Sequence, residues 1–329
     1  MMLAVVLVLF AVFALVVVIK VMSGMSTPEP VPLPVPTSVT STATNSPTSR
    51  QTSTSGDYQN ENYQVPEPDL YPPDLPEPVS ESEATDWMQN NAFYQQAVPS
   101  PVRCDVTMVD AATASKAELQ TYLDGIVGCL MRVWAPALED AGFNASRPSV
   151  TIYSGRIQSP CGRLDSQNAF YCAADQQIYY SQDLPSLLPN YQDNPFLPVE
   201  IMAHEFGHAI QAQTGILWSE SLWQQSYQDQ NNKSSAKAMS RRTELQADCF
   251  AGAFLNSVSQ SLSFTSGDRQ TIIDMVYYLG DDAVSGVPGY SGDHGQGVNR
   301  QSWFKTGLSG GTTSMCNTFD PSIPSAKVK

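Results

Sequence analysis

Three residues within a five-residue stretch, His204, Glu205 and His208, give the clearest chemical signal in the sequence. On an α-helix, residues four apart lie on one face, so the two imidazoles can offer nitrogens to a single metal ion. The pattern His-Glu-x-x-His is typical of sites in which two histidines hold Zn²⁺ and the glutamate takes a proton from metal-bound water. A chance pairing on a surface helix is the alternative, but two of the chain's three histidines lie in this motif.

Two histidines leave a catalytic zinc site incomplete, because such sites usually take three protein ligands and a water. The best third candidate is Glu244, at the start of the next helical stretch. Asp248 lies one turn later on the same face, at the top of an otherwise apolar row, and a buried carboxylate needs a partner. We assign Glu244 to zinc and Asp248 to the imidazole N–H of a ligand histidine. The alternatives are Asp248 as the metal ligand and a solvated helix start whose acids suit the helix dipole.

The elements that position these residues are mostly helices. An apolar run from Pro198 predicts the helix that carries the motif. The capping-box spacing of residues 115–118 opens a second periodic helix, which should end before Pro136. Short runs rich in β-branched and aromatic residues predict strands at 149–153 and 177–181. The other predicted elements are helices over about 238–258 and 268–279 and a polar loop at 219–235. Few strands beside several long helices predict an α+β fold.

All six cysteines lie beyond residue 85, and structural thiols, zinc ligands and disulfides are the three possibilities. Cys-x-x-Cys spacing is missing, which weakens the zinc interpretation, whereas an even count behind an apparent export signal favours disulfides. The sequence leaves the pairing open. The pairs that we favour are Cys161 with Cys172, Cys104 with Cys129, and Cys249 with Cys316.

The first 22 residues predict a single transmembrane signal anchor. Residues 3–19 form an unbroken apolar run of about the length that crosses a bilayer as a helix. A cleaved signal peptide is the alternative, but basic residues before the run and a small-x-small site after it are missing. Lys20 by itself would place the following domain in the cytoplasm, and the expected disulfides outweigh it. We therefore expect a single-pass cell-membrane protein with an extracellular C-terminal domain, or a secreted protein if the segment is cleaved.

Residues 23–85 predict a disordered linker between this anchor and a folded domain, residues 86–329. The linker is rich in Pro, Ser, Thr and acids, a composition that buries too little apolar surface to offset its ordering entropy. Residues 24–85 contain nine acids and one base, about half of the net charge of −15. The folded domain is only moderately acidic, which argues against nucleic acid as a partner.

Beyond the motif, several segments resemble the family of bacterial neutral zinc metallopeptidases, over roughly residues 90 to 308. They are Asn91-Ala92-Phe93-Tyr94 with Cys104, Ser159-Pro160-Cys161-Gly162, residues 170–175, Ile178-Tyr179-Tyr180, residues 204–208, residues 244–252, and His294-Gly295 with Arg300 and Trp303-Phe304. The resemblance implies a mainly helical, zincin-like domain with a small sheet. The family is itself similar to a wider group of zinc peptidases whose third ligand is a glutamate on a later helix. This similarity supports Glu244 as the third ligand.

The third histidine, His294, lies in a turn-like stretch between two glycines. A histidine in a loop is most often exposed to solvent, but the resemblance places this one on a family motif. We hypothesise that His294 or Arg300 donates a hydrogen bond to the oxyanion of a tetrahedral intermediate.

Together these features predict a membrane-anchored, extracytoplasmic zinc metallopeptidase that acts on a peptide or protein substrate. Zn²⁺ would activate a water, and Glu205 would act as the general base. The strand at 177–180 is expected to bind an extended substrate by strand addition, unless its tyrosines only pack. The alternatives are a non-catalytic zinc-containing binding or adhesion module and a zinc amidase acting on cell-wall peptides. Glu205 argues against the binding module, because zinc binding alone does not need that carboxylate.

Overall fold

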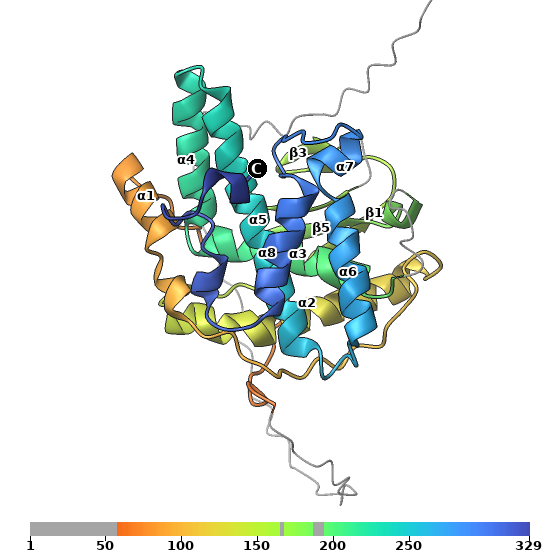
Figure 1. The fold of residues 1–329 in the computed structure, drawn as a ribbon. Coiled ribbons are helices and arrows are strands. Elements are labelled where there is room, and N and C mark those ends of the chain that lie inside the picture. Colours follow the sequence, from red (N-terminus) through yellow and green to blue (C-terminus); the bar gives the residue numbers. More distant parts are fainter. Residues whose placement is uncertain (1–57, 165–167, 187–193) are drawn as a thin grey trace, which may run out of the picture. The chain divides into compact units, whose positions relative to one another are not determined.

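The computed structural model describes residues 58–164, 168–186 and 194–329 (Figure 1). Within these residues, no helix combines the length and the apolar composition that a membrane crossing requires. The predicted anchor, residues 1–22, and the predicted linker up to residue 57 lie outside the described part. The described part is mainly helical with a small sheet, so the expected α+β class is confirmed.

Helix α2 (Lys116–Asp140) lies in the hydrophobic core and begins at the predicted capping box. It does not end before Pro136, as expected, but continues through it. Proline has no N–H, so it leaves the carbonyl one turn earlier without its helical donor. The side-chain amide of Asn60 donates to that carbonyl, on Arg132, at 2.8 Å. A tertiary contact thus replaces the missing helical hydrogen bond.

Residues 58–80 lie on the folded domain, where a disordered linker was expected. Gln59 forms a β-bridge with Val102, and the N–H of Asp69 donates to the carbonyl of Arg147 at 2.9 Å. Helix α1 (Glu81–Gln89) follows, capped by the Ser80 side chain. The predicted boundary at residue 86 is therefore wrong. Hydrogen bonds to the domain order a segment whose composition alone would leave it unfolded.

The small sheet has three strands in the order β1 (Val150–Tyr153), β5 (Gln177–Ser181), β4 (Ala169–Cys172). Strand β5 pairs with β1 in parallel and with β4 antiparallel, which confirms both predicted strands. Because β5 is paired on both sides, the expected strand addition at 177–180 is wrong; only an edge strand offers unpaired backbone groups. A separate hairpin consists of β2 (Ile157–Ser159) and β3 (Gly162–Leu164).

The C-terminal half is helical. Helix α3 (Leu197–Gln213) carries the motif, and α4 (Ile216–Asp229) and α5 (Lys233–Val258) form a hairpin beside α1 (Figure 1). The predicted loop at 219–235 is therefore mostly helix. Only Ile216, Ser219 and Glu220 of α4 are buried, so its polar sequence reflects exposed faces rather than irregular structure. The remaining helices are α6 (Ser266–Tyr278), α7 (Asp281–Ser285) and α8 (Gly297–Leu308), with short 3₁₀ turns at Ala92–Gln95, Leu184–Ser186, Thr313–Cys316 and Ser325–Lys327.

Three disulfides connect these elements, and all three favoured pairings are confirmed: Cys104–Cys129, Cys161–Cys172 and Cys249–Cys316. The first joins the segment before α2 to the middle of that helix. The second joins the β2–β3 hairpin region to β4. The third joins α5 to the 3₁₀ turn at Thr313–Cys316.

Candidate metal centre

Helix α3 is buried along its whole length except at His208. A glycine inside the motif permits this burial, because a Cβ on Gly207 would lie 3.0 Å from the Cα of Ala247. The backbones of α3 and α5 therefore approach closely at this point. This close crossing places Glu244, one turn before Ala247, beside the two histidines.

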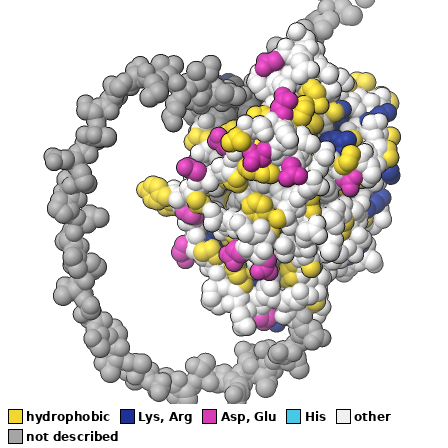
Figure 2. All heavy atoms as spheres, turned by 90° about the vertical axis from the view of Figure 1, so that its left-hand side faces the viewer, with side chains coloured by type: hydrophobic (Ala, Val, Ile, Leu, Met, Phe, Trp, Pro, Cys, Tyr) yellow, Lys and Arg dark blue, Asp and Glu magenta, His cyan; other side chains and the backbone are white. Residues whose placement is uncertain are grey.

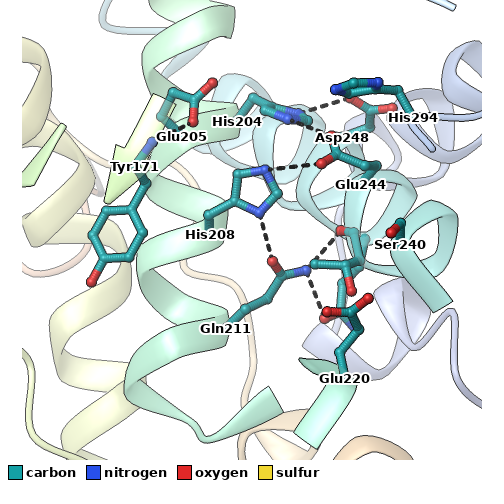
Figure 3. Close-up of polar contacts among 12 residues, drawn as sticks. Tyr171, His204, Glu205, His208, Gln211, Glu220, Ser240, Glu244, Asp248 and His294 are labelled. Atoms are coloured by element: carbon teal, nitrogen blue, oxygen red, sulfur yellow. Dashed lines mark hydrogen bonds and ion pairs between the residues drawn. The ribbon is translucent and has the colours of Figure 1, made fainter. Parts of the chain in front are cut away.

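The three predicted ligands converge (Figure 3). The Nε2 atom of His204 lies 3.3 Å from Oε2 of Glu244, and Nε2 of His208 lies 3.7 Å from Oε1 of the same carboxylate. Two ligand atoms at tetrahedral angles, each about 2.1 Å from Zn²⁺, are about 3.4 Å apart. Two imidazole nitrogens and one carboxylate at these separations form a donor set that fits zinc.

Asp248 is buried completely and lies behind His204 rather than in the ligand set. Its Oδ1 lies 2.9 Å from Nδ1 of His204, as the assignment to an imidazole N–H requires. Arg300 donates to both carboxylate oxygens, from Nε at 2.9 Å and from Nη2 at 2.7 Å. These bonds occupy Asp248, so it is a poor metal ligand. They also occupy Arg300, which is 5% exposed and therefore unsuited to the alternative role of oxyanion donor.

A second group of possible ligands consists of Glu200, His204 and Asp248. It is a weaker metal site, because the guanidinium of Arg300 already neutralises Asp248 and would repel a cation. Glu200 is 1% exposed, and burial raises the pKa of its carboxyl to about 7. The group of His204, His208 and Glu244 is therefore the better metal site.

The carboxylates at the centre stabilise positive charge on the neighbouring imidazoles. Burial opposes the imidazolium form of His204, but hydrogen bonds to Asp248 and Glu244 outweigh it and hold its pKa well above the usual value. Burial also opposes ionisation of Glu244, yet the nearby imidazoles of His208 and His294 lower its pKa below the usual range. A divalent cation held by His204, His208 and Glu244 would balance the charge of these carboxylates while its ligand imidazoles are neutral.

Glu205 points from α3 toward the edge of the sheet (Figure 3). It is 7% exposed, and its Oε2 accepts the backbone N–H of Tyr171 at 2.8 Å. Tyr171 belongs to β4, the outer strand that packs beside α3. The backbone of the edge strand therefore fixes the orientation of the predicted general base.

His294 lies at the rim of the centre, on the loop between α7 and α8, and its side chain is 56% exposed. Asp281 orders this loop, because its Oδ2 accepts the N–H groups of Gly292 and Gly295, each at 2.7 Å, and of His294 at 3.2 Å. The negative charge of Glu244 raises the pKa of the His294 imidazole. The structure thus brings the third histidine to the metal centre.

Sequence reasoning missed three residues that hold this site in place. Gln211 contacts Nδ1 of His208, and its position three residues after His208 on one helix was a usable signal. Tyr171 acts through its backbone N–H, which Glu205 accepts, and Asp281 acts through its carboxylate, which accepts backbone N–H groups of the His294 loop. Neither has a sequence spacing that relates it to the motif.

Comparison with known proteins agrees with this site. Residues 84–319 match the family described as "Putative neutral zinc metallopeptidase". The uncharacterized protein YpfJ of Escherichia coli K12 is 33% identical over 217 residues, which are 63% of this chain and 73% of that protein. The uncharacterized protein Rv2575 of Mycobacterium tuberculosis H37Rv is 29% identical over 206 residues, 57% of this chain and 66% of that protein. No solved structure matches significantly. The chain belongs to this zinc metallopeptidase family, and its cofactor is Zn²⁺.

Proposed function

We propose that this protein is an active zinc peptidase that hydrolyses peptide bonds outside the cytoplasm. The observation that carries the proposal is the convergence of two imidazoles and a carboxylate next to a second carboxylate that is not needed as a ligand. His204 and His208 would hold the metal through Nε2, and Glu244 through a carboxylate oxygen. The bound Zn²⁺ supplies Lewis acidity and lowers the pKa of a bound water toward ~7.

Glu205 is the general base in this proposal. Its Oε2 accepts the N–H of Tyr171, so Oε1 is the atom left to take the proton of the attacking water and pass it to the leaving amine. His294, exposed at the rim, donates to the carbonyl oxygen of the scissile bond as negative charge develops there.

Strand β4 provides a place for an extended substrate. In an antiparallel pair, alternate residues direct their N–H and C=O groups toward the partner strand. The N–H of Ser181 donates to the carbonyl of Asn168, so Phe170 also faces β5, while Ala169 and Tyr171 direct their backbone groups away from β5. The N–H of Tyr171 is bonded to Glu205, which leaves the carbonyl of Tyr171 and the N–H and carbonyl of Ala169 for a substrate. A peptide that pairs with Ala169 and with the carbonyl of Tyr171 would lie beside Glu205, which moves the expected strand addition from β5 to β4.

The three disulfides support an oxidising compartment, and the apolar N-terminal run supports attachment to the membrane from that side. On the face in Figure 2, acidic and apolar side chains are interspersed, and Lys and Arg side chains gather toward its right-hand side. We therefore propose a single-pass membrane protein whose catalytic domain is extracytoplasmic.

The proposal is tested by zinc content together with cleavage of a broad peptide library that includes cell-wall peptides. Wild type should contain zinc and cleave, whereas Glu205→Gln should keep zinc and lose activity, because only the base is removed. Zinc-loaded wild type that cleaves no peptide would support the binding module. Cleavage restricted to cell-wall peptides would support the amidase, and cleavage by Glu205→Gln at the wild-type rate would refute the role of Glu205.

A further inference from the structure

The two ligand histidines are held in chemically different ways. Behind His204 lies a carboxylate, Asp248, whereas Nδ1 of His208 contacts the amide oxygen of Gln211 at 2.8 Å (Figure 3). Gln211 is completely buried. Its Nε2 donates to the backbone carbonyl of Thr243 at 2.8 Å and to Oε1 of Gln246 at 3.1 Å.

The hydrogen bonds continue from Gln246, which is also completely buried. Its Nε2 donates to the hydroxyl of Tyr94 at 2.8 Å and to the backbone carbonyl of Cys316 at 3.0 Å. The Tyr94 hydroxyl in turn donates to the carbonyl of Met88 at 3.0 Å. A chain of side chains, His208–Gln211–Gln246–Tyr94, therefore ends on backbone carbonyls that belong to other parts of the fold.

These ends fix the direction of every hydrogen bond in the chain. A carbonyl oxygen can only accept, so the NH₂ group of Gln246 must face Cys316 and its oxygen must face Gln211. For the same reason the NH₂ group of Gln211 faces Thr243, and its oxygen faces His208. The proton of a neutral His208 imidazole is then on Nδ1, and the lone pair is on Nε2, the atom that faces Glu244.

We infer that Gln211 and Gln246 are positioning residues that select the Nδ1–H tautomer of His208 and so direct its Nε2 lone pair to the metal. The inference rests on the metal site of the proposed function but not on peptide hydrolysis. Residues that orient a ligand imidazole typically contribute about 10–100-fold to metal affinity. Gln211 contributes most, because it touches the imidazole, while Gln246 acts only by fixing the Gln211 amide.

The chain supplies a matched control. Gln213 is a second buried glutamine at the end of the same helix, but its amide donates to the carbonyl of Ser146 and does not contact His208. Gln213→Leu and Gln211→Leu therefore remove the same side chain from one helix. Only Gln211→Leu interrupts the hydrogen-bonded series His208–Gln211–Gln246–Tyr94. Tyr94→Phe removes a single hydroxyl and leaves Gln246 bonded to Cys316, so it is a milder variant within the chain.

The experiment measures zinc affinity of the full chain by competition with a chelator, and records ring-nitrogen NMR spectra after labelling histidine with ¹⁵N. The chain has three histidines, so the spectra contain few signals. We expect Gln211→Leu to weaken zinc binding about 10–100-fold and to give the metal-free His208 a mixture of tautomers. Gln246→Leu should have a smaller effect of the same kind, Tyr94→Phe a smaller one still, and Gln213→Leu none.

Several results would overturn the inference. One is zinc affinity and a His208 spectrum in Gln211→Leu that match wild type. Another is an equal loss of affinity in Gln211→Leu and Gln213→Leu, which would indicate a general packing effect. If Gln211→Leu fails to fold, the zinc affinities of the milder variants decide the question. Gln246→Leu should then bind zinc more weakly than Tyr94→Phe, and both more weakly than Gln213→Leu; equal affinities in all three would overturn the inference. Absence of zinc binding in wild type would instead refute the proposed function itself.

Discussion

Replacing Asp248 by asparagine is expected to destabilise the protein and to weaken zinc binding for two separable reasons. The carboxylate is completely buried and accepts hydrogen bonds from the guanidinium of Arg300 at 2.9 and 2.7 Å. The substitution keeps the shape but leaves the cation of Arg300 buried without a counter-charge. Breaking a buried ion pair in this way costs about 3–5 kcal/mol of unfolding free energy. His204 also loses the anion that its Nδ1–H contacts at 2.9 Å, which should weaken zinc binding about 10–100-fold.

A double substitution separates the two effects. Asp248→Asn with Arg300→Met removes both buried charges, so it should recover most of the lost unfolding free energy. It should not recover zinc affinity, because His204 still lacks its anionic partner. The assays are denaturant unfolding in the presence of a chelator and zinc competition on the same variants. If Asp248→Asn costs under about 1 kcal/mol, or if the double variant regains wild-type zinc affinity, the reasoning is refuted.

Three further predictions test other parts of the structure. Gly207→Ala places a Cβ 3.0 Å from the Cα of Ala247, so it should force α3 and α5 apart. Denaturant unfolding should show a loss of about 1–3 kcal/mol in unfolding free energy, and chelator competition should show weaker zinc binding. Asn60→Gly tolerates the backbone φ of 55° but removes the donor to Arg132, and unfolding should show a loss of about 1 kcal/mol; an unchanged midpoint would contradict the role of this contact. Burial raises the pKa of Glu200 from 4.5 to about 7, so the unfolded state loses the proton first and stability should fall as pH rises through that range. In Glu200→Gln the loss of unfolding free energy over this pH range should be smaller, by ~3 kcal/mol at most. Identical plots of unfolding free energy against pH for wild type and Glu200→Gln would refute the raised pKa of Glu200.

The errors made from the sequence have a common physical origin. Composition predicted a disordered segment up to residue 85 and a polar loop at 219–235, and both judgements treated polar residues as solvated. In the structure, residues 58–80 are ordered by hydrogen bonds to the domain, and α4 uses only a narrow buried face. The end of α2 was misplaced for a similar reason, because the donor that permits Pro136 lies far away in the sequence.

The sequence by itself indicated the candidate ligand set and favoured three cysteine pairs, although it left the pairing open. The spacing of His204 and His208 needs only a helix, and helical periodicity is a local property of the chain. Glu244 and Asp248 could be assigned because a carboxylate pair on an apolar helix face requires buried partners.

The tertiary structure alone decided what lies behind and beside those ligands. Arg300 neutralises Asp248, two buried amides orient His208, and β4 rather than β5 is the edge strand next to Glu205. Each of these contacts joins groups whose hydrogen-bond partners are set by how helices and strands pack, and sequence spacing carries no information on that packing. The chemistry of the centre was therefore readable from local pattern, whereas its orientation depended on the fold.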